Sequence, residues 1–558
     1  MKKLTKALVC VAMAVFLCLP AAACGGGQGD PDQLSIFGWS LASVQTAQKT
    51  NTPIYAKIKK NTGVDLKVHS VNSAAFDEAL NKLFNMRELT DLFITYGPEK
   101  PALYEKMIKD GAILPVSDYV SESKYPNLHK HLQQYEFLED NLYYAEGKQW
   151  SIPTNHSLEH AIYVRQDWID NLNQPEKLRT ILTEELGRTP TEEELETMKF
   201  KLPDTLLEFY RLARAFTKYD PDGNGQHDTY GYTGASDMWS ENWIYIAFSG
   251  GYQQMVPNGE GGYTSSDASE GAKQAIAFIN RLHNEGIMHP DWQTDTFSDK
   301  QDKFCQDKVG IIEAHCWFNN IVTGYISAHA DQSIEEASGR IAMIAPPAGP
   351  DGTRGILGHP GFWTAVCINA NIGEAKIEKA LTLMDYLYSP EGQDLFVYGV
   401  EGENYKVENG EKVSLMGKNA SGFNYTVASY DAAYPLSAFC NWTADYFSPF
   451  ATNADKIIAQ MEAAKAYATV EEHPMVQTPL YVKNFEGMIS FAEESFMDMI
   501  TSESNYREPA GGEVTWENLY SYNAAFNESW NAYIDKYMGD YQGKATIDEY
   551  NEYIRNIA

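Results

Sequence analysis

Cysteine is scarce in this sequence, and what there is follows no pattern. The seven cysteines among 558 residues are scattered and lack the spacing of a metal-binding motif. This argues against a disulfide framework and against a cysteine-rich metal centre. We expect the cysteines of the main body to be small buried apolar residues, namely Cys305, Cys316, Cys367 and Cys440.

Basic residues are also few relative to acidic ones. Lys and Arg number 44 against 76 Asp and Glu, which gives a formal net charge of −32. Such a surface argues against nucleic acid or an anionic lipid surface as a partner. Aromatic residues are abundant by contrast, at 13%, with 35 tyrosines and 11 tryptophans. Many belong in a core, but in an acidic exported chain they also suit neutral polar ligands such as sugars.

Long apolar runs are absent after the first two dozen residues, so the main body is expected to be soluble. The chain begins with a lysine-containing start followed by an apolar run at 7–20, which is typical of a signal peptide. The string AAAC at 21–24 resembles a bacterial lipobox, with Ala21 where leucine is usual. The resemblance implies a signal peptide at 1–23, lipidation of Cys24, and a flexible tether at 24–33 that anchors the protein outside the cell membrane. An ordinary secretory cleavage is the alternative.

Short apolar runs alternate with helical stretches near the start of the mature chain. Strands are predicted at 34–39, 64–68 and 91–96, with helices from residue 53 and at 76–83. This alternation favours an α/β lobe built on a largely parallel sheet.

Residues 220–231, with the sequence DPDGNGQHDTYG, have the spacing of a calcium-binding loop. Oxygen-bearing side chains stand at positions 1, 3, 5 and 9, and a glycine at position 6 allows the sharp turn. Position 12, where an EF-hand has a bidentate glutamate, is Gly231. We therefore predict a structural Ca²⁺ site that is not a complete EF-hand, with the ligands Asp220, Asp222, Asn224, Gln226 (through its carbonyl) and Asp228. A turn without metal is the alternative.

Several further motifs occur in a fixed order along the chain. They are GAILPV at 111–116, EGKQWSIP at 146–153, YVRQDW at 163–168, PPAGPDG at 346–352 and YGVEGE at 398–403. Together with the loop at 220–231, this order resembles the extracellular solute-binding proteins of carbohydrate ABC importers, in the lipoprotein branch of Gram-positive bacteria.

The resemblance implies an α/β, two-lobe, periplasmic-binding-protein-like fold with a central cleft and a helical C-terminal region. The first lobe would comprise 34–153 and 346–403, and the second 154–345 and 404–558. Residues 171–201 form a charged, helix-favouring stretch, which we interpret as a helical hairpin inserted in the second lobe. The implied function is capture of a carbohydrate, an oligosaccharide in particular, and its delivery to an ABC permease by hinge closure.

Two other classes of function remain open from the sequence. One is an exported polysaccharide-active hydrolase, because catalytic carboxylate pairs are set by spatial separation rather than by spacing in the sequence. The other is a binding protein for a non-sugar solute such as a peptide, since such lobes serve many solutes.

One short string resembles a peptidase motif. His156, Glu159 and His160 match the H-x-x-E-H pattern of inverted zinc peptidases, which requires a helix. Here the string follows Ile152-Pro153-Thr154 and runs into a β-rich segment, so a zinc site is not expected. The resulting prediction is a binding protein and not an enzyme.

Candidate ligand-binding residues lie near the expected junctions between the lobes. The carboxyl ends of strands in an α/β lobe open onto the ligand crevice, where flat rings can stack on sugar rings and polar groups can bond hydroxyls. Trp239 and Trp317 are the preferred pair, although core packing is the alternative for each tryptophan. The full set is Trp39, Asn155, Arg165, Trp239, Trp243, Glu313, His315, Trp317, His359 and Trp363.

Overall fold

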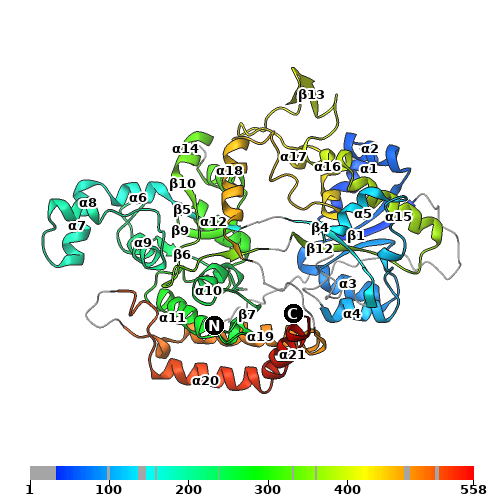
Figure 1. Cartoon of the computed structure of the whole chain (residues 1–558). Helices are drawn as coiled ribbons and strands as arrows, with labels where there is room; N and C mark the ends of the chain where they lie inside the picture. Colours follow the sequence, from blue (N-terminus) through cyan, green and yellow to red (C-terminus); the bar gives the residue numbers. More distant parts are fainter. Residues whose placement is uncertain are drawn as a thin grey trace, which may run out of the picture.

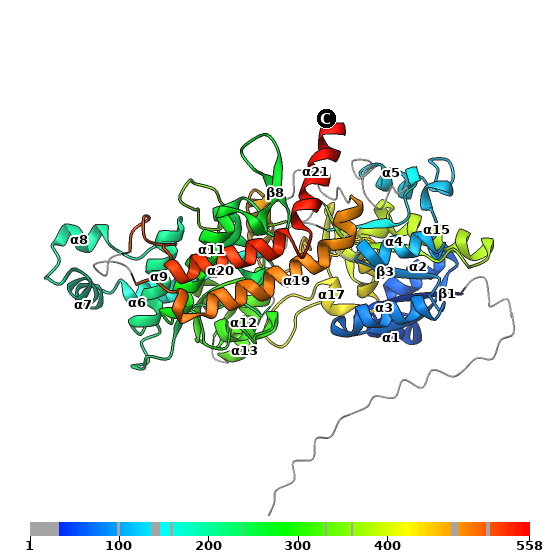
Figure 2. The ribbon, with the colours of Figure 1, turned by 90° about the horizontal axis from the view of Figure 1, so that it is seen from below.

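The computed structural model describes residues 33–96, 101–135, 146–156, 160–236, 238–329, 332–358, 361–469, 478–508 and 514–557. Within them the chain forms two lobes that lie side by side, with long C-terminal helices along one side of the pair (Figures 1 and 2). The predicted signal peptide, Cys24 and nearly all of the tether lie outside the described residues.

The first lobe is built on a five-stranded sheet of order β2-β1-β3-β12-β4. Strand β1 is parallel to β2 and β3, whereas β12 is antiparallel to both β3 and β4. The strands are β1 (Gln33–Trp39), β2 (Asp65–Val71), β3 (Leu92–Thr95), β4 (Ile152–Asn155) and β12 (Phe362–Ile368). Its helices are α1 (Ala42–Thr50), α2 (Pro53–Thr62), α3 (Phe76–Asn85), α4 (Pro101–Lys109), α5 (Pro126–Gln133), α15 (Glu374–Leu387), α16 (Pro390–Val397) and α17 (Val427–Tyr430).

The second lobe has a four-stranded sheet of order β10-β5-β9-β6. Strand β5 is antiparallel to both neighbours, and β6 is parallel to β9. The strands are β5 (His160–Arg165), β6 (Tyr230–Tyr232), β9 (Val309–His315) and β10 (Ile341–Ile344). Its helices are α6 (Gln166–Leu172), α9 (Leu206–Lys218), α10 (Asn242–Ser249), α11 (Glu270–Asn284), α12 (Phe297–Cys305), α13 (Phe318–Ala328), α14 (Ile334–Arg340) and α18 (Ala454–Lys465).

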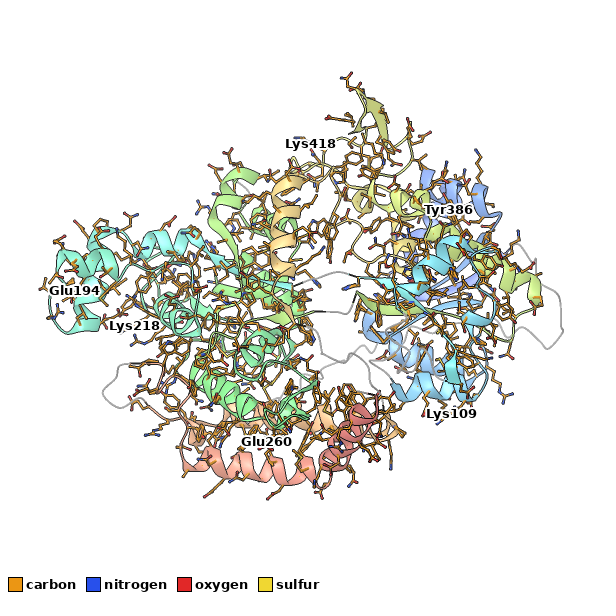
Figure 3. The ribbon with its side chains drawn as sticks, viewed as in Figure 1. Lys109, Glu194, Lys218, Glu260, Tyr386 and Lys418 are labelled. Carbon is orange, nitrogen blue, oxygen red and sulfur yellow. The ribbon has the colours of Figure 1, made fainter. Side chains whose placement is uncertain are left out.

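Three small ribbons complete the sheets. They are β7 (Met255–Pro257) with β8 (Tyr263–Ser265), β11 (Ile356–Leu357) with β15 (Ala468–Thr469), and β13 (Tyr405–Glu408) with β14 (Glu411–Ser414). The C-terminal helices are α19 (Pro479–Thr501), α20 (Ala524–Met538) and α21 (Gly543–Ile557). Exposed charged side chains such as Lys109, Glu260 and Lys418 project from the outer surface of the molecule (Figure 3).

Alternation along β5 and β9 places apolar side chains on both faces of the second sheet, as a sheet covered by helices on both sides requires. Ile162, Val164 and Ile311 pack on one face with α9, α10 and α11. Tyr163 and Ile312 pack on the other face with α12 and α13. All four cysteines of the described residues are buried and form no disulfide with one another, as expected.

The core of the first lobe contains more of the chain than the expected boundaries give it. Several residues from Met416 to Phe450, among them Val427, Phe439 and Cys440, are buried in the core of the first sheet, although Phe423 packs in a core of the second. The predicted boundaries place this segment in the second lobe. Its tyrosines and short helical turns carry no strand pattern that would show which sheet they join.

The segment predicted as an inserted hairpin forms α7 (Pro175–Leu186) and α8 (Glu192–Thr197). Helix α8 begins with a capping box in which Thr191 and Glu194 satisfy each other's backbone amides. The pair lies at the end of the second lobe that is farthest from the first lobe (Figure 1).

Helix α19 contacts both lobes. Val482, near its start, is buried in the core of the first lobe, and the helix contacts α4. Met488, Phe496 and Ile500 are buried in the core of the second lobe. No helix in the part of the chain that the structure describes is long and apolar enough to cross a membrane.

A buried asparagine fixes the end of α19 against the second lobe. The side-chain amide of Asn280, on α11, donates to the carbonyls of Met499, Ile500 and Ser502 at 3.0, 2.8 and 3.1 Å. These are the carbonyls that a helix end leaves without intrahelical partners.

Replacing Asn280 with alanine should therefore lower the free energy of unfolding by about 1–3 kcal/mol, because buried carbonyls lose their donor. Asn284→Ala is the matched control one turn away, since Asn284 is half-buried and contacts this helix end only at 3.5 Å. Urea unfolding followed by circular dichroism measures both. Equal losses in the two variants would contradict the assigned role of Asn280.

Candidate functional site

Strands of both sheets end where the chain passes between the lobes. Strand β4 ends at Asn155 and β5 begins at His160, so only residues 156–159 join the two sheets. Residues 358–361 likewise join β11 of the second lobe to β12 of the first. The backbone amide of His156 donates to the carbonyl of Gly361 at 2.9 Å, so the two connections meet where they join the first lobe.

Four aromatic residues gather at this edge of the first sheet, and we call them the aromatic cluster: Trp39, Tyr96, Trp363 and Trp442. Trp39 ends β1 and lies nearly parallel to Trp442, with ring centroids 5.0 Å apart, and to Tyr96, at 5.3 Å. Trp363 meets Trp39 and Trp442 edge-on at 5.7 and 5.4 Å. Trp39 is buried at 6% exposure, while the other three rings are half-buried and keep part of their surface in solvent.

Trp442 is held in the cluster by the end of β4. Its backbone amide donates to the carbonyl of Asn155, and the amide of Asn155 donates to Cys440, both at 3.0 Å. The indole Nε1 donates to the hydroxyl of Thr364 at 2.6 Å. The orientation of this ring is therefore set by β4 and β12 together.

A second group, which we call the histidine cluster, lies at the facing edge of the second sheet: His160, Trp239, Phe297 and His315. His160 and His315 are cross-strand partners of β5 and β9, with ring centroids 4.6 Å apart. Trp239 meets His160 edge-on at 4.3 Å and is half-buried. Phe297 packs on His315 at 4.6 Å.

A buried ion-pair network supports the histidine cluster from beneath. Glu313 on β9 is fully buried and contacts both His160 Nδ1 and the Lys300 ammonium, which is also fully buried. Lys300 donates to Ser240, next to Trp239, at 2.6 Å. Burial alone would raise the pKa of Glu313, but the positive charge of Lys300 and the hydrogen bond with His160 hold it well below its usual range. Glu313 is thus an ionised carboxylate whose charge is balanced inside the protein.

Half of the ten predicted ligand-binding residues lie in or beside the two clusters. Trp39, Trp363, Trp239 and His315 lie in the two clusters, and Asn155 fixes Trp442 next to them. Trp317, half-buried, lies 5.6 Å from Tyr446 in the segment that leaves the first lobe. His359 lies outside the described residues.

Three predicted contacts are not available to a ligand at this site. Trp243 is fully buried in the core of the second lobe and donates to the hydroxyl of Tyr232 at 3.2 Å. Glu313 is fully buried beneath the histidines. Arg165 is 2% exposed, at the opposite end of β5 from His160, where it pairs with Asp167 and Asp307.

The position of Arg165 has a simple topological reason. The carboxyl end of a strand faces the ligand crevice in a parallel sheet, but β5 is antiparallel to β9. Its amino end, at His160, therefore lies beside the carboxyl end of β9. Sequence reasoning missed His160 as a site residue for this reason, and it missed Tyr96 and Trp442 because no local pattern distinguishes them.

The two histidines of the peptidase-like string belong to different surroundings. The ring of His156 lies 5.6 Å from Trp363, on the side of the first lobe, whereas His160 is bound to Glu313 in the second lobe. Glu159 lies outside the described residues. His156 directly follows β4, and His160 is the first residue of β5.

The side chains of the loop at 220–231 bond to one another. Asn224 Nδ2 donates to Asp222 and Asp228 at 2.8 and 3.1 Å, and the amide of Gly225 donates to Asp220 at 3.2 Å. The proximity of Asp220 contributes, after burial, to raising the pKa of Asp222. Asp220 Oδ1 is buried and has no hydrogen-bond partner within the described part of the chain.

Positive charges approach the same loop. The ammonium of Lys308 pairs with Asp228 at 2.6 Å, and that of Lys177 donates to the carbonyl of Asp220 at 2.5 Å. Across the described ranges, no group of three or more His, Cys, Asp or Glu side chains is arranged to hold a metal ion. The crowded carboxylates and the unpaired oxygen of Asp220 nevertheless fit the donor set that a hard cation prefers.

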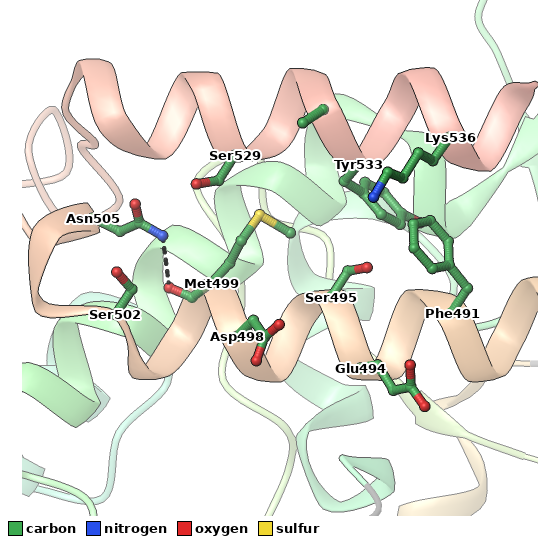
Figure 4. Close-up of a pocket in the computed structure, with 11 residues that line it drawn as sticks. Phe491, Glu494, Ser495, Asp498, Met499, Ser502, Asn505, Ser529, Tyr533 and Lys536 are labelled. Atoms are coloured by element: carbon green, nitrogen blue, oxygen red, sulfur yellow. Dashed lines mark hydrogen bonds between the residues drawn. The ribbon is translucent and has the colours of Figure 1, made fainter.

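A separate groove lies between α19 and α20 (Figure 4). Its cavity volume is about 350 Å³, and its polar lining includes Glu494, Asp498 and Lys536. Asn505 donates to the carbonyl of Met499 at 3.2 Å within it. No described residue of this groove belongs to the aromatic or histidine cluster, so it is a seam between packed helices and not part of the site between the lobes.

A family model described as bacterial extracellular solute-binding protein matches residues 43–394. The polygalacturonan/rhamnogalacturonan-binding protein YtcQ of Bacillus subtilis is 25% identical over 389 residues, which cover 68% of this chain and 68% of YtcQ. Lipoprotein LipO of the same species is 24% identical over 437 residues, which cover 75% of this chain and 77% of LipO.

Solved structures support the fold. The substrate-binding protein FusA of Streptococcus pneumoniae, in complex with kestose, superposes with a TM-score of 0.62 at 16% identity, covering 94% of this chain and 100% of FusA. A FusA structure described as an EF-hand mutant in complex with fructo-nystose gives a TM-score of 0.61 at 17% identity, with the same coverage. The predicted two-lobe α/β fold is thereby confirmed.

The buried network predicts a large effect of removing the Glu313 charge. Glu313→Gln leaves the Lys300 ammonium buried without a counter-ion, which should cost about 3–5 kcal/mol in the free energy of unfolding at pH 7. Glu378→Gln removes a partner from the exposed pair with Lys124 and should change stability little. Urea unfolding measures both, and equal effects would contradict the network.

The same network predicts how the stability difference between wild type and Glu313→Gln depends on pH. Because the pKa of Glu313 is lower in the folded than in the unfolded protein, its stabilisation is complete above the unfolded value and is lost as pH falls toward the folded value. The stability gap between wild type and Glu313→Gln should therefore stay constant from pH 7 to about 4.5 and shrink at lower pH. A gap that does not change below pH 4.5 would show that Glu313 is not held ionised.

Proposed function

The chain belongs to the bacterial extracellular solute-binding protein family, and from this premise we propose that it binds an oligosaccharide between its two lobes and delivers it to an ABC permease. The family consists of binding proteins, which agrees with the expectation that the chain is not an enzyme. The exported hydrolase therefore has no support beyond the abundance of carboxylates.

The observation that carries the proposal is the aromatic cluster. Tyr96, Trp363 and Trp442 keep part of their ring surface in solvent although apolar rings favour burial. Rings held rigidly at strand ends offer flat apolar faces to the C–H faces of sugar rings. Trp39, almost fully buried, fixes their orientation from behind.

The histidine cluster supplies complementary chemistry on the other lobe. Trp239 offers a further half-buried ring, and the imidazoles of His160 and His315 can bond hydroxyl groups. Because the Lys300 ammonium pairs with the Glu313 carboxylate, the floor of this cluster carries no uncompensated negative charge. This favours an uncharged sugar, in line with the acidic character of the whole chain.

Closure of the lobes around the ligand follows from the connections between them. The connections 156–159 and 358–361 are each four residues long and meet at His156 and Gly361, so they can act as a hinge between the lobes. A ligand that contacts both clusters stabilises the closed state, which the permease then recognises.

Replacing Trp363 with alanine removes a ring from the cluster and should weaken oligosaccharide binding by about tenfold or more, equivalent to at least about 1.4 kcal/mol. Isothermal titration calorimetry against a panel of neutral oligosaccharides and peptides measures the effect. Trp516→Ala is the matched control, because Trp516 is also half-buried but packs elsewhere, on the core of the second lobe.

Two outcomes would count against this proposal. Tight binding of peptides with no response to any oligosaccharide would assign the protein to the non-sugar alternative. Oligosaccharide binding that is unchanged in Trp363→Ala, or reduced equally in Trp516→Ala, would remove the aromatic cluster from the site.

We also propose that the loop at 220–231 binds Ca²⁺ as a structural ion. The side chains that would hold it are those of Asp220, Asp222, Asn224 and Asp228, together with the carbonyl of Gln226. The unpaired oxygen of Asp220 and the crowding of Asp220 with Asp222 support this assignment. The description of one FusA structure as an EF-hand mutant is a parallel in a protein of similar fold.

Calcium should stabilise the fold by mass action without altering ligand preference. At a free concentration 100 times its dissociation constant, the gain is about 2.7 kcal/mol, so chelation should lower the melting temperature. Differential scanning calorimetry with and without chelator measures this, and Asp222→Asn should abolish the response. A calcium-loaded protein whose melting temperature does not move on chelation would refute the stabilising role.

We further propose that Cys24 carries the lipid anchor, which lies outside the described residues. The support is the lipobox-like string at 21–24 and the similarity to the B. subtilis lipoprotein LipO. Mass spectrometry of the membrane fraction, compared with a Cys24→Ala variant, tests the anchor.

A further inference from the structure

A small pocket lies beside His160, at the edge of the second sheet. Strand β10 pairs with β5 only as far as Ile344, opposite Ile162, so the first residues of β5 have no paired strand on that side. Helix α18 and the end of β10 enclose the gap. The cavity has a volume of about 100 Å³, which is room for about three water molecules.

The pocket is mostly apolar but contains one polar atom without a partner. Its apolar lining consists of Ala161, Met343, Ile344, Pro346, Ile356 and Ala464. Gln460 of α18 also lines it, and its side-chain oxygen Oε1 is buried and has no hydrogen-bond partner among the described residues. Leaving a buried acceptor unpaired is unfavourable, so this atom is suited to receive an N–H or O–H donor.

The pocket adjoins the site between the lobes. His160 forms part of its wall and is also the centre of the histidine cluster, next to Trp239. The pocket is not sealed, because Gln460 is half-buried and Ala463 at its rim is exposed. Because His160 belongs to both, a sugar bound against the histidine cluster would place its substituents next to this pocket.

Resting on the proposed carbohydrate-binding function, we propose that this pocket receives the acetamido group of an N-acetylated amino sugar. The methyl end of the group contacts the apolar lining, and its N–H donates to Gln460 Oε1. A plain hydroxyl would leave most of the apolar lining without contact. The ammonium of a non-acetylated amino sugar would have to be desolvated here without a counter-ion. The acetamido group combines one small apolar end with one N–H donor, which matches the lining.

Matched pairs of disaccharides that differ only in one or two acetamido groups test the proposal. Isothermal titration calorimetry would compare N,N′-diacetylchitobiose with cellobiose, and N-acetyllactosamine with lactose, on the mature protein with calcium present. We expect at least one acetylated sugar to bind ten times more tightly than its partner. Equal affinities within both pairs, or binding of other oligosaccharides but of no acetylated sugar, would overturn the pocket assignment and leave the proposed function standing. Failure of every oligosaccharide would overturn both.

Variants on α18 separate the pocket from the rest of the site. Gln460→Leu removes the acceptor and Ala464→Leu fills the cavity, so each should reduce the preference for the acetylated sugar at least tenfold while affinity for its unacetylated partner is kept. Ala459→Leu is the control, because Ala459 is exposed on the same helix and is not among the described residues of the lining. Retention of the preference in both pocket variants, with melting temperatures like that of wild type, would refute the proposal.

Discussion

The placement of the two lobes relative to each other depends on two four-residue connections, 156–159 and 358–361, that join strands of different sheets. Five peptide units separate Asn155 from His160, so their Cα atoms can be at most about 17–18 Å apart. The hydrogen bond between His156 and Gly361 holds the two connections together. The edges of the two sheets at which these strands end are therefore kept close together, however the lobes move.

This constraint explains why aromatic and imidazole rings gather where they do. At this edge each lobe exposes the ends of strands whose central residues are buried. Side chains at strand ends are less completely packed in the core and can face the other lobe. On the first lobe the cluster is rigid, because Trp39 is packed from behind and Trp442 is hydrogen-bonded to β4 and Thr364. On the second lobe the buried pair of Glu313 and Lys300 fixes His160 and, through Ser240, the turn that carries Trp239. Rigidity on both sides lowers the entropy lost when a ligand is held.

Much of the fold could be predicted from the sequence because its strands and helices are locally consistent. The expected strands at 34–39, 64–68 and 91–96 correspond to β1, β2 and β3, and the capped helix before the calcium-like loop is α9. What the sequence did not reveal depends on contacts between distant segments. The sequence of β5 does not show whether this strand runs parallel or antiparallel to its neighbours. Arg165 was therefore predicted at the ligand-facing edge of the sheet, where His160 lies instead. Trp442 joins the cluster through its hydrogen bonds with Asn155 and Thr364, and nothing around it in the sequence distinguishes it from Trp243, which is core.

The central claim is that one ligand contacts both lobes at these facing edges. Hydrogen–deuterium exchange of the mature protein, with and without a mixed panel of neutral oligosaccharides released by partial hydrolysis of cell-wall polysaccharides, tests this most directly. The account predicts increased protection in peptides that carry Trp363 and Trp442 and, at the same sugar concentration, in peptides that carry Trp239 and His315. Protection confined to one lobe, or located instead at the groove between α19 and α20, would contradict it.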